Sequence, residues 1–266
     1  MQKKNVLIII LTALVFLSAA CLGVVSVFRI NFVEVNAPVV STEAQAEAAE
    51  LQKQLYEAYE GENIFSMDES AATQIFEQFP YFKMTSFEKV YPNRIVIQAT
   101  EDVELFAFKN GENSFYVLGA DGTLLSERDS AINRSDGASN IVVTGVEIQA
   151  NKGEIASNDE CLAWLFEFCQ KTSDLLGGIR KNVTAIEVLR PTSSATEMMF
   201  KIHFKEGVVG YIHNPGAYTK EKAEELIEVY LSLSDSQRLR GMIGVTDNGD
   251  GAIGQYAKDD IFSEQN

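Results

Sequence analysis

A run of apolar residues without any charge, from Val6 to Phe28, constrains the fold of this chain more than any other feature. At about 1.5 Å per residue, a helix over this run is roughly 34 Å long, which is enough to cross a hydrocarbon core of about 30 Å. Lys3 and Lys4 stand before the run, and fewer positive charges follow it closely. The sequence therefore predicts a cytoplasmic tail at residues 1–5, a single transmembrane helix over residues 6–28, and an extracytoplasmic chain beyond.

Two kinds of cleavage offer alternatives to an uncut anchor. Ser18-Ala19-Ala20 resembles a signal-peptidase site, and Cys21 behind small residues resembles a lipoprotein box. However, Ser18 stands where a lipobox has Leu, Val or Ile. The apolar run also continues to Val27, whereas the apolar part of a cleaved leader normally ends before the cut. These features favour the uncut anchor.

Acidic residues outnumber basic ones, 38 to 22, which gives a formal net charge of −16. A surface of this sign repels phosphate backbones, so nucleic acid is a poor candidate for a partner. The same sign argues against a basic patch that holds anionic lipid headgroups. The partners that we expect are neutral or basic, or are selected by shape.

The side chains that carry most metal and nucleophilic chemistry are scarce. The chain has three Cys and two His and contains no Cys-x-x-Cys motif. Cys161 and Cys169 fall about 12 Å apart on a predicted helix, beyond the roughly 7 Å that a disulfide allows. No Gly-x-Ser-x-Gly turn presents a serine to His203 or His213. We therefore predict no metal, no cofactor and no catalytic site.

The segment after the apolar run has the pattern of a small domain. Periodicity and turn residues predict, in order, a strand at 32–35, a helix from Thr42, a helix from Ser66, and strands at 82–91 and 94–100. Thr42 and Gln45 form a capping box for the first helix. The order strand, helix, helix, strand, strand predicts a domain over residues 29–101 with both helices on one face of a three-stranded sheet.

The remaining chain is richer in strands and predicts a second domain over residues 102–256. Helices are expected over about 158–176 and 219–233, and the polar residues 126–140 are expected to form a loop. Two strands, 241–245 and 251–256, close the fold, and residues 257–266 form a flexible tail. The fold class is α+β, in which a mixed α/β domain with a mostly antiparallel sheet follows the smaller domain.

The acidic segment between the two last strands admits two interpretations. Asp247-Asn248-Gly249-Asp250-Gly251 has the appearance of a calcium loop. Gly249, however, takes the third position, where a ligand oxygen is needed, and Lys258 takes the twelfth, where a Glu belongs. A polar hairpin turn is the better prediction.

Several landmarks, taken in order, resemble the FtsQ/DivIB family of bacterial cell-division proteins. Gly61-Glu62-Asn63-Ile64-Phe65 resembles the family's link between two helices, and Tyr91-Pro92-Asn93-Arg94-Ile95-Val96-Ile97, with Glu101 behind it, resembles a strand of its POTRA domain. Looser similarity runs through Phe115–Leu118, Thr144-Gly145, Lys220–Leu226 and Gly251–Gly254. The chain departs from the family at Asp102-Val103-Glu104 and at His213-Asn214.

The resemblance implies a POTRA domain (β-α-α-β-β) followed by a β-domain, in an adaptor of the division complex at the cell membrane and the septum. It implies FtsB/DivIC-like and FtsL-like partners that add a strand to the C-terminal edge of the β-domain. An open edge offers unpaired N–H and C=O groups to such a strand. The small residues expected to allow close approach and the apolar residues expected to make contact are Gly251, Ala252, Gly254, Ile243, Val245, Ile253 and Tyr256. Core packing is the alternative interpretation for each apolar residue.

Two other functions stay open at the level of the sequence. One is an extracytoplasmic sensor or chaperone module of an export system that uses a POTRA-like unit. The other is a membrane-tethered wall hydrolase, which the scarcity of catalytic side chains disfavours.

Overall fold

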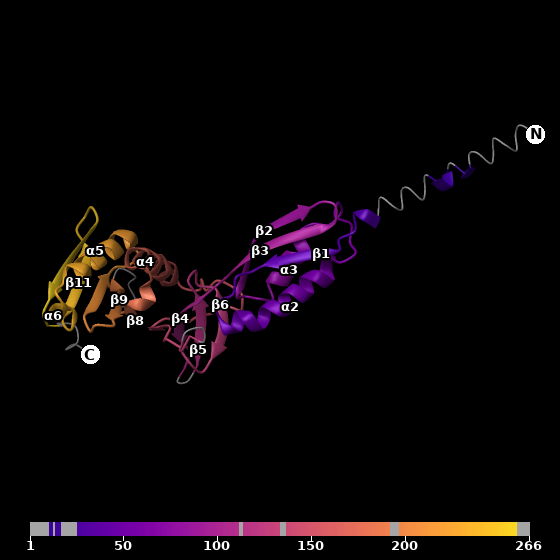
Figure 1. The fold of residues 1–266 in the computed structure, drawn as a ribbon. Coiled ribbons are helices and arrows are strands. Elements are labelled where there is room, and N and C mark those ends of the chain that lie inside the picture. Colours follow the sequence, from indigo (N-terminus) through magenta and orange to yellow (C-terminus); the bar gives the residue numbers. More distant parts are fainter. Residues whose placement is uncertain are drawn as a thin grey trace, which may run out of the picture. The chain divides into compact units, whose positions relative to one another are not determined.

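A computed structural model describes residues 11–12, 14–16, 26–111, 114–133, 137–191 and 197–259. The chain divides into two compact units, unit 1 (residues 1–101) and unit 2 (residues 102–266) (Figure 1). Each unit has its own sheet and helices, and the fold class is α+β.

The prediction of a transmembrane helix over residues 6–28 is contradicted. A crossing helix requires about 20 consecutive apolar residues. Among the described residues, no helix combines the length and the apolarity needed to cross a membrane. Much of the range 6–28, and the tail predicted at residues 1–5, lie outside the described residues.

Unit 1 is a three-stranded sheet with two helices. Its elements are β1 (Phe32–Asn36), α2 (Thr42–Tyr59), α3 (Ser70–Phe76), β2 (Phe82–Val90) and β3 (Arg94–Glu101). The sheet order is β1-β3-β2, with β1 parallel and β2 antiparallel to β3. The elements follow one another in the order that the sequence predicts.

Tyr59 connects the two helices of unit 1 to the sheet. Its ring lies 5.6 Å, between centroids, from the ring of Phe87 in β2. Its hydroxyl accepts a hydrogen bond from the N–H of Ala72 at 2.8 Å and donates to the carbonyl of Asp68 at 3.0 Å. A buried tyrosine is favourable when its hydroxyl is satisfied in this way. The residue therefore holds α2 and α3 together against the sheet.

Helix α2 begins at Thr42, as the sequence predicts, but its capping residue differs, and helix α3 begins away from its predicted start. Ser41, not Thr42, caps α2, and its hydroxyl accepts from the N–H of Ala44 at 3.1 Å. Helix α3 begins at Ser70 rather than Ser66, preceded by Asp68, whose carboxylate accepts from the Ser70 N–H at 3.0 Å. Neighbouring Ser, Thr and Asp side chains compete for the same backbone donors, so residue type alone does not select the cap.

Unit 2 is built on a nine-stranded sheet in the order β12-β11-β10-β9-β8-β7-β4-β5-β6. Its elements are β4 (Glu104–Lys109), β5 (Phe115–Gly119), β6 (Leu124–Arg128), β7 (Ile141–Thr144), α4 (Glu160–Leu176), η1 (Ile179–Lys181), β8 (Val183–Leu189), β9 (Met199–Phe204), β10 (Val209–His213), α5 (Thr219–Ser232), α6 (Asp235–Arg238), β11 (Met242–Asp247) and β12 (Ala252–Ala257). The pairs β4–β7, β7–β8 and β10–β11 are parallel, so the sheet is mixed. Strand β12 includes Ala257, one residue beyond the predicted boundary, and residues 260–266 lie outside the described residues.

Helices α4 and α5 pack on one face of this sheet. Phe168 of α4 meets Phe200 of β9 edge to face at 6.2 Å, and Phe204 stacks on Tyr230 of α5 at 4.2 Å. These residues belong to one core that extends from β4 to β11. Because side chains alternate along a strand, intervening residues such as Lys201 point to the opposite face. The pattern of burial along β9 shows this alternation.

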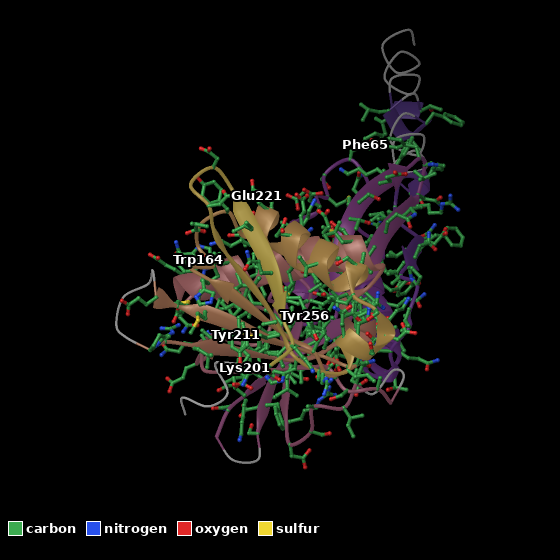
Figure 2. All side chains as sticks on the ribbon, turned by 90° about the vertical axis from the view of Figure 1, so that its left-hand side faces the viewer. Phe65, Trp164, Lys201, Tyr211, Glu221 and Tyr256 are labelled. Atoms are coloured by element: carbon green, nitrogen blue, oxygen red, sulfur yellow. The ribbon has the colours of Figure 1, made fainter. Side chains whose placement is uncertain are left out.

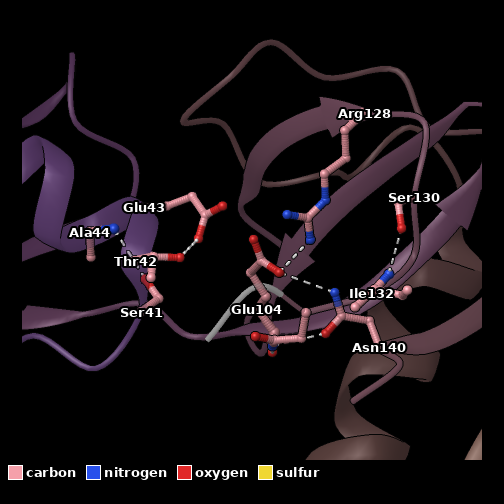
Figure 3. Close-up of polar contacts among 10 residues, drawn as sticks. Ser41, Thr42, Glu43, Ala44, Glu104, Arg128, Ser130, Ile132 and Asn140 are labelled. Carbon is pink, nitrogen blue, oxygen red and sulfur yellow. Dashed lines mark hydrogen bonds and ion pairs between the residues drawn. The ribbon is translucent and has the colours of Figure 1, made fainter. Parts of the chain in front are cut away.

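A buried polar cluster surrounds Glu104 of β4, whose side chain is 1% exposed. Arg128 of β6 pairs with this carboxylate at 2.5 Å, and the side-chain amide of Asn140 donates to it at 3.2 Å (Figure 3). Asn133 donates to the backbone carbonyl of Glu104 at 3.2 Å. The prediction of a loop over residues 126–140 is wrong at its start, because residues 126–128 continue β6. At its other end Asn140 is buried but lies outside any strand or helix.

We expect Glu104→Ala to lower the free energy of unfolding of unit 2 by about 3–5 kcal/mol, because the buried guanidinium of Arg128 loses its carboxylate. Trp164, the single tryptophan of the chain, lies in α4 and reports the unfolding of unit 2 by fluorescence in urea. Glu127→Ala is the control, because Glu127 is exposed and bonds to exposed side chains. Its expected effect is about 0.5 kcal/mol. Equal losses in both variants would contradict the role assigned to the cluster.

Candidate partner-binding edge

Strand β12 forms one edge of the sheet in unit 2, beside β11 at the yellow end of the chain (Figure 1). Its one neighbour among the described residues is β11, with which it pairs antiparallel. The turn closes with a hydrogen bond from the N–H of Asn248 to the carbonyl of Gly251 at 3.2 Å, and Gly249 has a φ of 96°. The predicted polar hairpin turn is therefore confirmed.

The outer backbone of β12 is partly occupied. The N–H of Gly254 donates to Oε1 of Glu225, in α5, at 2.9 Å, so it faces away from β11. Because N–H and C=O of one residue point to the same side of an antiparallel strand and alternate residues share that side, Ala252 and Tyr256 also face outward. The side-chain amide of Asn248 approaches the carbonyl of Ala252 at 3.4 Å. Within the described part of the chain, the other outward groups are open to an added strand.

Ile243 and Val245 do not reach this edge, so their predicted contact with a partner is corrected. Both side chains are 0% exposed and belong to the core. They stand on β11, which β12 separates from the edge. Core packing, the alternative interpretation from the sequence, describes both residues.

The small residues of β12 make room for a helix of the same unit. A Cβ at Gly254 would lie 2.9 Å from Cγ2 of Val229 and 3.0 Å from Cγ of Glu225, so the missing side chain lets α5 approach the strand. Ala252 packs against the core. Gly251 lies in the turn, where a Cβ would have Asn248 Oδ1 at 4.0 Å as its neighbour. Close approach at Gly254 is thus an internal requirement of unit 2.

Tyr256 and Ile253 differ in how far their side chains are exposed for contact with a partner. Tyr256 packs against the core, and its hydroxyl donates to the carbonyl of Arg240 at 3.1 Å. Ile253 is 43% exposed and lies beside a cavity of about 350 Å³. The other residues that line this cavity are His213, Met242, Gly244, Thr246, Gln255, Tyr256 and Ala257. Among the predicted contact residues, Ile253 therefore presents its side chain most openly.

The face of the sheet on the side of this cavity is polar as well as apolar. Tyr211 of β10 pairs in register with Lys201 of β9 and with Gly244 of β11. Figure 2 shows Tyr211 and Lys201 on these neighbouring strands. A Cβ at Gly244 would meet Cε of Met242 at 3.5 Å, and Tyr211 is 1% exposed. The cavity lies next to this row.

A buried lysine that was not predicted from the sequence fixes the hairpin to the rest of unit 2. Lys222 of α5 is fully buried, and its Nζ donates to the carbonyls of His213 at 2.8 Å and Asn214 at 2.6 Å. The same ammonium pairs with the carboxylate of Asp247, which also accepts from the Asn214 amide at 3.0 Å. The spacing in the sequence was one signal of this burial. Lys222 lies four residues before Leu226, and residues four apart share one face of a helix.

This cluster shifts the pKa of two groups. Burial raises the pKa of Asp247, but hydrogen bonds from Lys222 and Asn214 outweigh burial, so the pKa lies below the ordinary carboxyl value. Burial, helped by the charge of Lys222, lowers the pKa of His213 against a smaller opposite effect of Asp247. At neutral pH the hairpin is therefore anchored by a charged carboxylate beside a neutral imidazole.

A larger cavity, of about 600 Å³, lies away from β12. It is bounded by the carboxyl ends of the parallel strands β4, β7 and β8 and by the start of α4. Asp159 caps α4 by accepting from the N–H of Cys161 at 3.0 Å, and it also pairs with Arg190. These two charges neutralise one another, and none of the predicted contact residues lines this cavity.

No protein-family model matches this chain, and no curated protein sequence gives a significant match. The resemblance to FtsQ/DivIB stays a prediction.

We expect Asp247→Asn to lower the free energy of unfolding of unit 2 by about 2 kcal/mol at neutral pH, because the buried ammonium of Lys222 loses its charged partner. A carboxyl group with a depressed pKa in the folded state contributes stability above its unfolded pKa of about 3.9. That contribution is lost as the pH falls through the folded pKa. The difference between wild type and variant should therefore shrink below about pH 4.

Urea unfolding of both proteins, followed by Trp164 fluorescence across this pH range, measures the difference. Asp250→Asn is the matched control, because Asp250 lies exposed in the same turn. A stability difference between wild type and Asp247→Asn that stays constant down to strongly acid pH would refute the ion-pair role.

Proposed function

We propose that this chain is a scaffold of a bacterial division complex that acts by binding other proteins, without catalysis. Its partners are small proteins resembling FtsB/DivIC and FtsL, which it holds at the division septum. The observation that carries the proposal is the outer backbone of β12, which is unpaired with any described strand and only partly occupied by side chains. The element order of unit 1 supports a POTRA-like domain, and the edge hairpin of unit 2 supports a β-domain that accepts an added strand.

Strand addition at β12 exchanges hydrogen bonds with water for hydrogen bonds between main chains. Each such bond contributes about 0.5–1.5 kcal/mol net, so side-chain contacts must add to them for stable capture. Ile253 and the cavity beside it offer an apolar contact of this kind. The incoming strand must also displace Glu225 from the N–H of Gly254.

We expect Ile253→Lys to weaken partner capture about tenfold or more, because it replaces a central apolar contact by a charge that edge strands use against pairing. The fold should stay intact, because the side chain is already partly exposed. A proline at this position is a poorer probe, because the N–H of Ile253 points toward β11 by the same alternation that turns Gly254 outward. The measurement is affinity capture of the full chain from its own cells, followed by mass spectrometry of division proteins.

Leu231→Lys is the matched control, because Leu231 is an exposed leucine on α5 at a distance in sequence from the edge strand. Unaltered co-purification of FtsB/DivIC-like proteins with Ile253→Lys rejects the site. Capture of export components in place of division proteins, together with a fluorescent fusion that does not gather at mid-cell, rejects the function and favours an export module.

Removing the carboxylate that occupies the edge should have the opposite effect on binding. We expect Glu225→Ala to lower the dissociation constant of the partner complex about fivefold, which corresponds to about 1 kcal/mol for one displaced hydrogen bond. Glu228→Ala is the control, because Glu228 is an exposed carboxylate on the same helix. Titration of the purified chain with the captured partner measures both constants, and weaker binding by Glu225→Ala would count against competition at Gly254.

A further inference from the structure

Three aromatic side chains of unit 1 form an exposed cluster, the aromatic triad Phe28, Phe65 and Tyr91. The ring centroids of Phe28 and Phe65 lie 4.8 Å apart, and those of Phe65 and Tyr91 lie 5.3 Å apart. Phe65 is nevertheless 61% exposed and Tyr91 56% exposed. Figure 2 shows Phe65 at the surface of unit 1. Aromatic rings that gather on a surface without being covered indicate a contact site.

The backbone beneath the triad is firmly held. The N–H of Ile64 donates to the carbonyl of Phe28 at 3.0 Å, and the N–H of Asn31 donates to the carbonyl of Asn93 at 3.0 Å. The N–H of Phe65 donates to the side chain of Asn63 at 2.9 Å. The segment that leads out of the apolar run is thereby clamped between the loop after α2 and the turn between β2 and β3. The rings are presented by a fixed frame.

The chain next to the triad is apolar. Residues 6–28 carry no charge, and Phe28 is both the last residue of that run and a member of the triad. Val27 and Phe32, on either side, are 54% and 60% exposed. Aromatic rings, above all those with a polar tip such as tyrosine, favour the interfacial layer of a bilayer. A lipid surface is the one occupant that suits both the triad and the uncharged run beside it.

We infer that Phe28, Phe65 and Tyr91 form a lipid-contact site that inserts into the interfacial layer of a bilayer. The net charge of −16 sets the class of lipid, because it disfavours anionic headgroups and leaves zwitterionic ones. The contact lies in the plane of the membrane surface and requires no helix that crosses it. It is independent of strand addition at β12, which involves unit 2.

Fluorescence quenching by brominated lipid tests this site in the full chain. Phe65→Trp is made together with Trp164→Phe, so that one tryptophan reports from the triad, and the protein is mixed with phosphatidylcholine vesicles that carry bromine on their acyl chains. The emission of position 65 should shift to shorter wavelength and lose intensity. Tyr91→Trp in the same background is a second reporter in case the first variant does not fold.

Two controls locate the contact. Wild-type Trp164, in unit 2, should keep its intensity. Val40→Trp, with Trp164→Phe, places a tryptophan at a 72% exposed position of unit 1 beside Glu101, at the other end of β3 from Arg94. Eight residues of strand at about 3.3 Å each separate these ends by roughly 23 Å. This reporter should also stay unquenched.

Four outcomes overturn the proposal. The full chain does not float with the vesicles, positions 65 and 91 keep their emission while the chain floats, or position 40 is quenched as strongly as position 65. A blue shift at position 65 that appears without lipid and grows with protein concentration assigns the triad to contact between copies of the chain, which also overturns a lipid site.

Discussion

One buried charge, the ammonium of Lys222, determines where the edge strand lies. A charged group removed from water must be paired and hydrogen-bonded, or it costs several kcal/mol of stability. Lys222 finds its acceptors at the end of β10 and in Asp247 at the end of β11. Because β12 pairs with β11 alone among the described strands, its position depends on the hairpin, and the start of the hairpin depends on this ion pair. The geometry available to a partner is thus set inside unit 2.

An open edge is also a hazard, because any extended chain can pair with it. In unit 2 the carboxylate of Glu225 reaches from α5 to the N–H of Gly254 and occupies a group that a stray strand would use. The missing side chain at Gly254 permits this approach. A partner that displaces the carboxylate must supply contacts beyond the main chain, for which Ile253 and its neighbouring cavity are suited. In the proposed function, protection of the edge and selection of the partner therefore arise from the same few residues.

The sequence predicts those parts of the fold that depend on local periodicity. The strands predicted over 82–91 and 94–100, the helix predicted over 219–233 and the polar turn at 247–251 each follow from side-chain spacing or turn chemistry, and each is present. Lys222 and Glu104 escaped prediction because charged residues normally face solvent, and their burial depends on partners distant in the chain. The parallel pairs β4–β7 and β10–β11 also escaped prediction, because the paired strands are distant in the chain. The two isoleucines Ile243 and Ile253 show why the contact residues of the edge could not be predicted reliably. Residue type does not distinguish an isoleucine in the core from an exposed one.

The acidity of the chain limits the forces that its two candidate contact surfaces, the β12 edge and the aromatic triad, can use to bind a partner or a lipid surface. Charge attraction acts over about 10 Å at moderate salt, and a net charge of −16 directs it only toward basic partners. The β12 edge and the aromatic triad Phe28, Phe65 and Tyr91 both use forces of shorter range, namely main-chain hydrogen bonds and apolar contact. Such forces do not steer an encounter, and they discriminate only after the surfaces have met. If the two surfaces act as proposed, selection at both rests on the fit of a held backbone frame. The internal contacts of Lys222 in unit 2 and the clamp around Phe28 in unit 1 then matter more to the proposed functions than the many exposed carboxylates.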